Sequence, residues 1–126
     1  MKKVIQTKNA PAPIGPYSQA VQTGNLLFVS GQIAINPETE ELNLASIEEE
    51  THQVMRNIKA ILLEAEITFA HVIKTSIFLS DMNNFAKVNE VYGSYFTADF
   101  PARETVQVSV LPKNVNVEIS VIAAIA

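Results

Sequence analysis

The sequence predicts an α+β fold in which two helices pack on one face of a mixed β-sheet. Apolar residues recur at steps of three and four in only two segments, residues 46–66 and 83–100. Elsewhere the apolar runs are short, rich in β-branched residues and bounded by Gly, Pro or Asn, as is typical of strands. The predicted order is βββ-α-β-α-ββ, and the length of 126 residues predicts a single domain over residues 1–126.

The first third of the chain predicts three strands that follow a stiff, proline-rich loop. They cover residues 17–23, 26–30 and 32–35. Gly31 interrupts the last two, so we expect a bulge or a close backbone approach at this position.

The two helices have clear start and stop signals. Ser46 followed by Glu49 fits a capping box, and this helix is expected to end near Glu66. The carboxylates of residues 48–50 are expected to be solvated in its first turn, where the helix dipole favours them. The second helix is expected to begin at Asn83 or Asn84 and to run to Pro101, with its aromatic residues packed in the core.

The remaining strands are predicted over residues 72–79, 104–111 and 115–125. The short connection at residues 112–114 favours antiparallel pairing of the last two. The final strand is apolar on both faces, yet two helices can cover only one face of the sheet. We therefore expect the other face to be covered by further copies of the chain.

Composition excludes several classes of function. The net charge is −4 and the nine Lys and Arg residues are scattered, which argues against a nucleic-acid partner. The chain has no Cys, and His52 and His71 show no ligand spacing, so no metal site is expected. The absence of an apolar signal core and of an 18-residue apolar run predicts a cytoplasmic protein without membrane contact.

Two charged residues in apolar strands are the strongest candidates for chemistry. Glu118 lies among β-branched residues, where a carboxylate is costly unless it is paired or used. Arg103 follows Pro101 at the start of the preceding strand. The two side chains either form a structural ion pair or serve a site in which Arg103 grips a substrate carboxylate with its planar fork.

Several segments together resemble the RidA (YjgF) family over nearly the whole chain. They are Ala12-Pro13-Ile14-Gly15-Pro16-Tyr17-Ser18-Gln19-Ala20, Ser30-Gly31-Gln32-Ile33, Asp81-Met82-Asn83-Asn84-Phe85, Val88-Asn89-Glu90-Val91-Tyr92, Pro101-Ala102-Arg103, Leu111-Pro112-Lys113 and Val117-Glu118-Ile119. The resemblance implies a chorismate-mutase-like fold and a homotrimer with three ligand clefts at subunit interfaces. It also implies the hydrolysis of reactive 2-imino acids and their enamine tautomers, 2-aminoacrylate and 2-aminocrotonate, to 2-keto acids and ammonia, without a cofactor.

The same resemblance implies a role for each site residue. Arg103 matches the arginine that binds the substrate carboxylate, and Glu118 matches the glutamate that activates water. The matching cleft residues are Tyr17, Ser30, Gly31 and Asn89. The family commonly has Arg-Ser-Cys where this chain has Arg103-Glu104-Thr105, so only the backbone carbonyl of Thr105 is expected to bond the water. We expect this departure to affect substrate preference more than chemistry.

A second class of function is a non-catalytic trimer that senses a small ligand. Such a protein needs Arg103 but not Glu118, and both are present. Translation inhibition or ribonuclease activity, described for some members of the family, is disfavoured by the acidic net charge of −4.

Overall fold

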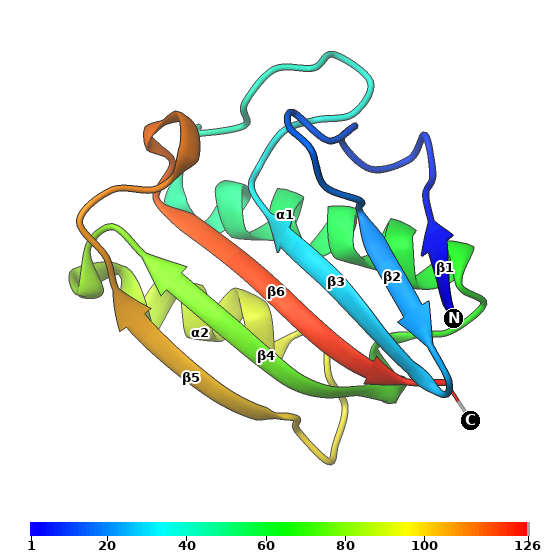
Figure 1. Ribbon diagram of the computed structural model, residues 1–126. Coiled ribbons are helices and arrows are strands. Elements are labelled where there is room, and N and C mark those ends of the chain that lie inside the picture. The colour runs from blue at the N-terminus through cyan, green and yellow to red at the C-terminus, as the bar shows by residue number, and fades with distance from the viewer. Residues whose placement is uncertain (126) are drawn as a thin grey trace.

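The computed structural model describes residues 1–125 and contains one six-stranded mixed sheet with two α-helices on one of its faces (Figure 1). The elements are β1 (Lys2–Ile5), β2 (Ala20–Thr23), β3 (Leu26–Gln32), α1 (Ile47–Glu64), β4 (Val72–Leu79), α2 (Phe85–Gly93), β5 (Ala102–Gln107) and β6 (Val117–Ala124). The strands lie in the order β1-β2-β3-β6-β4-β5. The predicted fold class is confirmed.

The first three strands differ from their predicted positions. Strand β1 was not predicted, because three of its four residues are exposed and the segment lacks an apolar pattern. Strand β3 continues through Gly31 to Gln32, with a shift in its register against β6 between Val29 and Gln32. The predicted separate strand over residues 32–35 is wrong, since beyond Gln32 only Ile35 makes an isolated bridge to Leu42.

The predicted antiparallel pairing of the last two strands is also wrong. Strand β4 lies between β5 and β6, parallel to β5 and antiparallel to β6. The chain passes from β4 through α2 to β5, and such a helical crossover returns a strand parallel to the one it left. Residues 112–114 form a short 3₁₀ turn that leads the chain past β4 to β6.

The helices begin as predicted, and α2 ends earlier. Ser46 caps α1 by accepting a hydrogen bond from the backbone N–H of Glu49 at 3.1 Å. Helix α2 ends at Gly93 rather than near Pro101, and residues 94–101 form an irregular connection to β5. Tyr95 and Phe96 of this connection still pack against the core, which explains their helix-like spacing, whereas Phe100 is 64% exposed.

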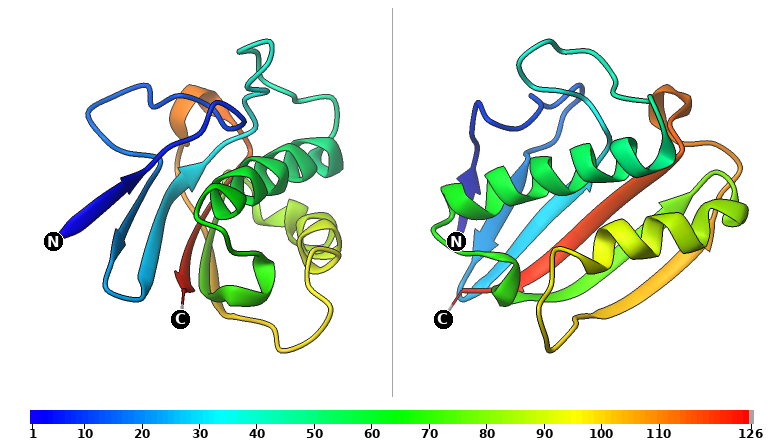
Figure 2. Two further views of the ribbon diagram at one scale, coloured as in Figure 1. Left: turned by 90° about the vertical axis from the view of Figure 1, so that its right-hand side faces the viewer. Right: turned by 180° about the vertical axis from the view of Figure 1, so that it is seen from behind.

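The main core lies between the helices and the sheet, and Figure 2 shows both helices on the same side. It contains Leu27, Val54, Ile58, Ile77 and Ile119, each no more than 1% exposed. Alternate residues of the strands point away from the helices, as the period of two requires.

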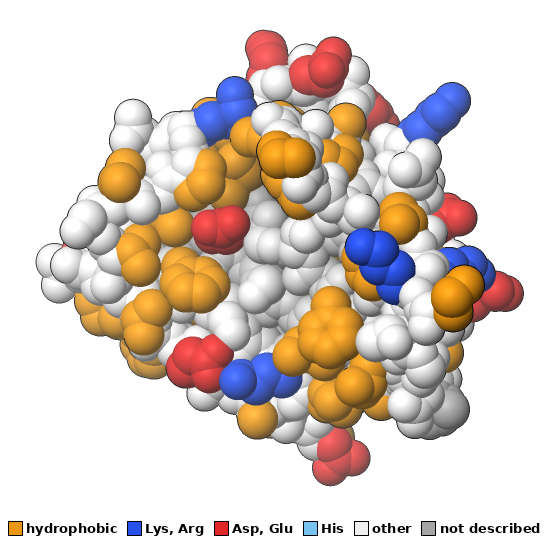
Figure 3. Space-filling model, viewed as in Figure 1, with side chains coloured by type: hydrophobic (Ala, Val, Ile, Leu, Met, Phe, Trp, Pro, Cys, Tyr) orange, Lys and Arg blue, Asp and Glu red, His pale blue; other side chains and the backbone are white. Residues whose placement is uncertain are grey.

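The face of the sheet opposite the helices stays uncovered within residues 1–125. We call it the open face. Register aligns Val4, Val21, Phe28 and Ile122 in one apolar row across four strands of it. Val4 and Phe28 are 49% and 43% exposed, and Figure 3 shows the hydrophobic side chains of this face. The predicted uncovered apolar face is thus present.

Two further properties concern the part of the chain that the structure describes. None of its helices is long and apolar enough to cross a membrane. Its His, Asp and Glu residues form no group of three or more that is suited to a metal ion.

Candidate functional site

The residues predicted for the site fall into two groups on opposite faces of the sheet. Asn89, Arg103 and Thr105 form what we call the arginine group, on the side of the helices. Tyr17, Ser30, Gly31 and Glu118 form the glutamate group, on the open face. The register explains this division. Arg103 aligns with the buried Thr75 of β4, whereas Glu118 alternates along β6 with residues that face the core.

The arginine group holds its guanidinium with neutral partners. The amide oxygen of Asn89 accepts a hydrogen bond from Nη1 of Arg103 at 2.6 Å. The rings of Phe85 and Tyr92 lie 5.6 and 5.2 Å from the guanidinium carbon, within the range of cation–π attraction. These contacts orient the guanidinium, and no carboxylate among residues 1–125 forms an ion pair with it.

The cleft beside Arg103 is open and has a volume of about 670 Å³. Its walls include Phe85, Asn89, Phe100 and Pro101. Thr105 lies two residues further along β5, and its hydroxyl oxygen is buried without a hydrogen-bond partner among residues 1–125. The cleft therefore offers a cation from Arg103 and an amide from Asn89 beside apolar surface, whereas Thr105 is not among the residues that line it.

The glutamate group is built around the irregularity in β3. A Cβ atom added to Gly31 would meet the carboxylate of Glu118, with its Cδ atom at 2.9 Å, so only glycine leaves room for this carboxyl group. The hydroxyl of Ser30 donates to the carbonyl of Ser18 at 2.6 Å and ties the preceding loop to β3. In that loop the Tyr17 side chain is 47% exposed and lines a small pocket together with Gly31.

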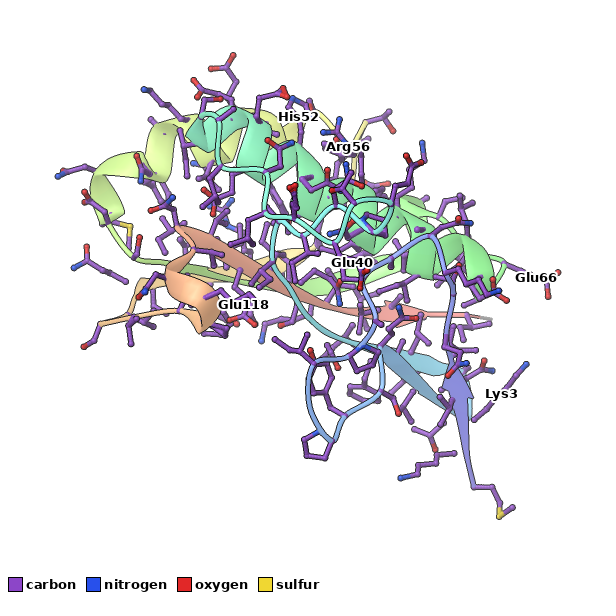
Figure 4. All side chains as sticks on the ribbon, turned by 90° about the horizontal axis from the view of Figure 1, so that it is seen from above. Lys3, Glu40, His52, Arg56, Glu66 and Glu118 are labelled. Carbon is purple, nitrogen blue, oxygen red and sulfur yellow. The ribbon has the colours of Figure 1, made fainter. Side chains whose placement is uncertain are left out.

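Burial raises the pKa of the Glu118 carboxyl above its ordinary value. The direction agrees with the expectation from its apolar strand. Figure 4 labels Glu118, together with His52 and Arg56, which belong to α1 on the other side of the sheet. A partly buried carboxyl group with a raised pKa is a candidate for proton transfer.

Arg103 and Glu118 do not form an ion pair within one chain. Strand β4 separates β5 from β6, and the two side chains leave opposite faces of the sheet. Over residues 1–125, the single ion pair joins Lys74 and Glu104 at 3.1 Å on the open face. The structural ion-pair alternative is therefore wrong for the isolated chain.

Three residues near the site are not among those that the sequence predicted for it. Phe85 and Tyr92 were expected to be core residues. Tyr92 is one, at 4% exposed, and its ring also lies against Arg103, whereas Phe85 is 36% exposed and lies against Arg103. Their spacing of seven with Asn89 between them puts all three on one helical face, a signal that the sequence carries. Glu104, at the departure from the family motif, bonds Lys74 and Ser76, and the Ser76 hydrogen bond is the main cause of its lowered pKa.

A family model described as Endoribonuclease L-PSP matches residues 7–125 of the chain. The chain belongs to the RidA (YjgF) family. It is 44% identical to Reactive Intermediate Deaminase A, chloroplastic, of Arabidopsis thaliana, over 98% of this chain and 66% of that protein.

Two solved structures superimpose closely on this chain. One is a protein of unknown function from Yersinia pestis, described as a member of the conserved Rid protein family. It has a TM-score of 0.96 and 52% identity, covering 98% of this chain and 99% of its own. The other is TdcF of E. coli with bound serine. It has a TM-score of 0.94 and 41% identity, and the match covers 98% of this chain and 99% of the TdcF chain.

Proposed function

We propose that this protein is a RidA-type deaminase that hydrolyses reactive 2-imino acids, and their enamine tautomers 2-aminoacrylate and 2-aminocrotonate, to 2-keto acids and ammonia. The observation that carries the proposal is the state of Arg103. Its guanidinium is held by an amide and two aromatic rings and has no carboxylate partner within residues 1–125. Such a fixed, uncompensated fork suits a ligand that brings its own carboxylate.

We further propose that the working site is completed between two copies of the chain in a homotrimer. The arginine group and the glutamate group lie on opposite faces of one sheet, so one chain cannot present both to a small ligand. The uncovered apolar row on the open face supports association next to the glutamate group. In a closed ring, every interface then joins Arg103 of one copy to Glu118 of the next.

The chemistry needs little beyond positioning and one proton carrier. Arg103 binds the α-carboxylate and fixes the imine carbon in the cleft. In the protonated imine, the carboxylate of Glu118 takes a proton from water as the water oxygen bonds to the imine carbon, and the C=N π electrons move to the nitrogen, which becomes a neutral amino group. Glu118 then returns its proton to this nitrogen. The C–N bond breaks as the Glu118 carboxylate takes the hydroxyl proton of the carbinolamine, and the 2-keto acid and ammonia leave, with the last proton passing from Glu118 to ammonia or water.

Two of the relatives support this class of substrate. The Arabidopsis protein is named a reactive intermediate deaminase, and the TdcF structure holds serine, which presents a carboxylate next to an amine. A 2-imino acid has the same arrangement of groups at a different oxidation level. The preference among imino acids is a separate matter and depends on the cleft beside Phe85 and Phe100.

A coupled assay tests the proposal. A pyridoxal-phosphate-dependent dehydratase acting on serine or threonine releases the enamine, and keto-acid formation is followed with and without this protein. We expect the keto acid to form faster with the wild-type protein than without it, and Arg103→Ala to give no such acceleration. Tight pyruvate binding without any acceleration would contradict an enzyme and favour the ligand-sensing alternative.

A further inference from the structure

Three buried polar side chains of α1 stand out because each is held by side-chain hydrogen bonds inside the folded chain. Glu50, Gln53 and Asn57 are 1%, 6% and 1% exposed. Their spacing places them along one side of the helix over two turns. We call them the polar seam. Glu50 had been expected to be solvated in the first turn of α1, and that expectation is wrong.

The first end of the polar seam holds the backbone just before Glu118. One carboxylate oxygen of Glu50 accepts from the backbone N–H groups of Asn116 and Val117 at 2.7 and 3.2 Å. The other oxygen accepts from the side-chain amide of Asn116 at 2.8 Å. Both oxygens are therefore used, and three donors offset the cost of burying the carboxylate.

The other end of the polar seam holds the backbone just after Gly31. The side-chain amide of Asn57 donates to the carbonyls of Ile33 and Ile35 at 3.1 and 2.9 Å. Gln53 donates to the oxygen of the same amide at 3.0 Å, which fixes its orientation. Ile33 and Ile35 follow Gly31 by two and four residues.

The two anchored segments meet at the contact between Gly31 and Glu118. A packing role alone would be met by apolar side chains at the three positions, without the cost of burying a carboxylate and two amides. Hydrogen bonds add direction, and four of those made by the side chains of Glu50 and Asn57 reach a backbone within four residues of Gly31 or Glu118. We propose that Glu50 and Asn57 are positioning residues that hold the Glu118 carboxyl group against Gly31.

The proposal rests on the proposed function for its kinetic consequence, but its structural part can be measured without turnover. Because the proposed role requires the side chain of residue 50 to reach the backbone N–H groups of Asn116 and Val117, its length should matter more than its charge. Glu50→Asp keeps the charge but is one methylene too short to span the gap. Glu50→Gln keeps the length of the side chain. If the Asn116 amide turns over, its oxygen accepts a hydrogen bond from the new Gln amide. The Ser80 hydroxyl, which now donates to the Asn116 oxygen, then accepts from the Asn116 amide nitrogen instead.

The test compares Glu50→Asp, Glu50→Gln and the core control Ile61→Val, which lies on the same helix and is fully buried. The first readout is the titration of the Glu118 side-chain carbon by NMR in the purified protein. The second is kcat and KM for imine hydrolysis. In Glu50→Asp we expect the pKa of Glu118 to move toward its ordinary value as the carboxyl group gains solvent. We also expect kcat to fall roughly 10- to 100-fold, with KM within about twofold.

In Glu50→Gln both readouts should stay near those of the wild type, and Ile61→Val should lose thermal stability only. An unchanged Glu118 titration in folded Glu50→Asp would overturn the proposal, as would an equal change in the Ile61→Val control. If Glu50→Asp does not fold, Asn57→Ala releases the second segment and must produce the same shift. If the wild type hydrolyses no imine, the proposed function fails while the titration still decides the role of the polar seam.

Discussion

At the scale of single residues, the protein separates Arg103, the proposed carboxylate-binding group, from Glu118, the proposed proton carrier. Arg103 is held by Asn89, Phe85 and Tyr92, none of which is charged. Glu118 has no cationic partner among residues 1–125 and a pKa raised by burial. Each charge is therefore left for a ligand or a second copy of the chain.

Replacing Arg103 should abolish binding and turnover together. We expect Arg103→Ala to lose pyruvate binding in calorimetry and imine hydrolysis in the coupled assay, with little change in melting temperature because the side chain is exposed. Arg103→Lys should recover little of either, since a point charge cannot make two parallel hydrogen bonds. A stable Arg103→Ala protein with undiminished hydrolysis would end the proposed enzyme mechanism.

Replacing Glu118 by Gln should remove turnover but keep binding. The rate should fall by about 10²–10⁴-fold, the usual contribution of a positioned acid–base group, while the Kd for pyruvate stays nearly the same. In the wild type, kcat/KM should rise with pH through the raised pKa of Glu118, and this acid limb should be missing in the variant. An acid limb that persists in Glu118→Gln would assign it to another group.

The same substitution should not lower stability at neutral pH. A carboxyl group whose pKa is higher in the folded protein stabilises the fold below its unfolded pKa of about 4.3, and this contribution is lost as pH rises through the folded pKa. Glu118→Gln should therefore melt at or above the wild-type temperature at pH 7. If Glu118 belonged to a buried structural ion pair, its replacement would instead lower the free energy of unfolding by about 3–5 kcal/mol.

At the scale of elements, the irregular end of β3 and the start of β6 together form the glutamate group. Gly31→Ala should push the Glu118 carboxyl group aside, because the added Cβ would lie 2.9 Å from its Cδ atom and 3.1 Å from its Cγ atom. The neighbour is a flexible side chain, so we expect a small change in melting temperature and a roughly 10- to 100-fold loss of kcat. Wild-type kinetics in this variant would show that the position of Glu118 is not critical.

The elements also show what sequence patterns can and cannot supply. The period of α1 and its Ser46 cap were predictable from local chemistry, and so was a break at Gly31. The parallel placement of β5 beside β4 was not, because the short turn at residues 112–114 favours a hairpin unless the crossover through α2 is known. The burial of Glu50 depends on the approach of residues 116–117 to α1, which no local pattern records.

The candidate site shows the same limit. Arg103 and Glu118 were identifiable as charges in apolar strands, and the family resemblance supplied Tyr17, Ser30, Gly31, Asn89 and Thr105. Their division between two faces follows from the register of β5 and β6 against β4, which sets the face on which each side chain emerges. The sequence therefore predicted which residues belong to the site but not that one chain holds it as two separate groups.

At the scale of the whole molecule, charge argues against RNA as a substrate, although the family model carries the name of an endoribonuclease. With nine scattered cations and a net charge of −4, we expect no binding of single-stranded RNA in fluorescence anisotropy and no cleavage of it. Salt-dependent binding with a Kd of roughly 1 μM or tighter would overturn this prediction. Cleavage that is lost on substitution of Arg103 or Glu118 would do so as well.

The proposed function makes the assembly part of the chemistry. In the proposed trimer the arginine group of one copy meets the glutamate group of another, so a monomer should be inactive even when fully folded. A charged residue in place of Phe28, which is 43% exposed in the apolar row of the open face, should dissociate the trimer in sedimentation and abolish hydrolysis together. An active monomer would show that the site is complete within one chain.

Mixing two inactive variants tests the central claim most directly. Arg103→Ala and Glu118→Gln proteins are unfolded together, refolded in equal amounts and assayed for imine hydrolysis against each variant refolded alone. In a mixed trimer, an intact Arg103 from one copy meets an intact Glu118 from the next at about one quarter of the interfaces if assembly is random. We predict that activity returns to about that fraction of the wild-type rate. Mixed trimers that form, as shown by differently tagged subunits purifying together, but stay as inactive as the separate variants would contradict a site shared between two copies.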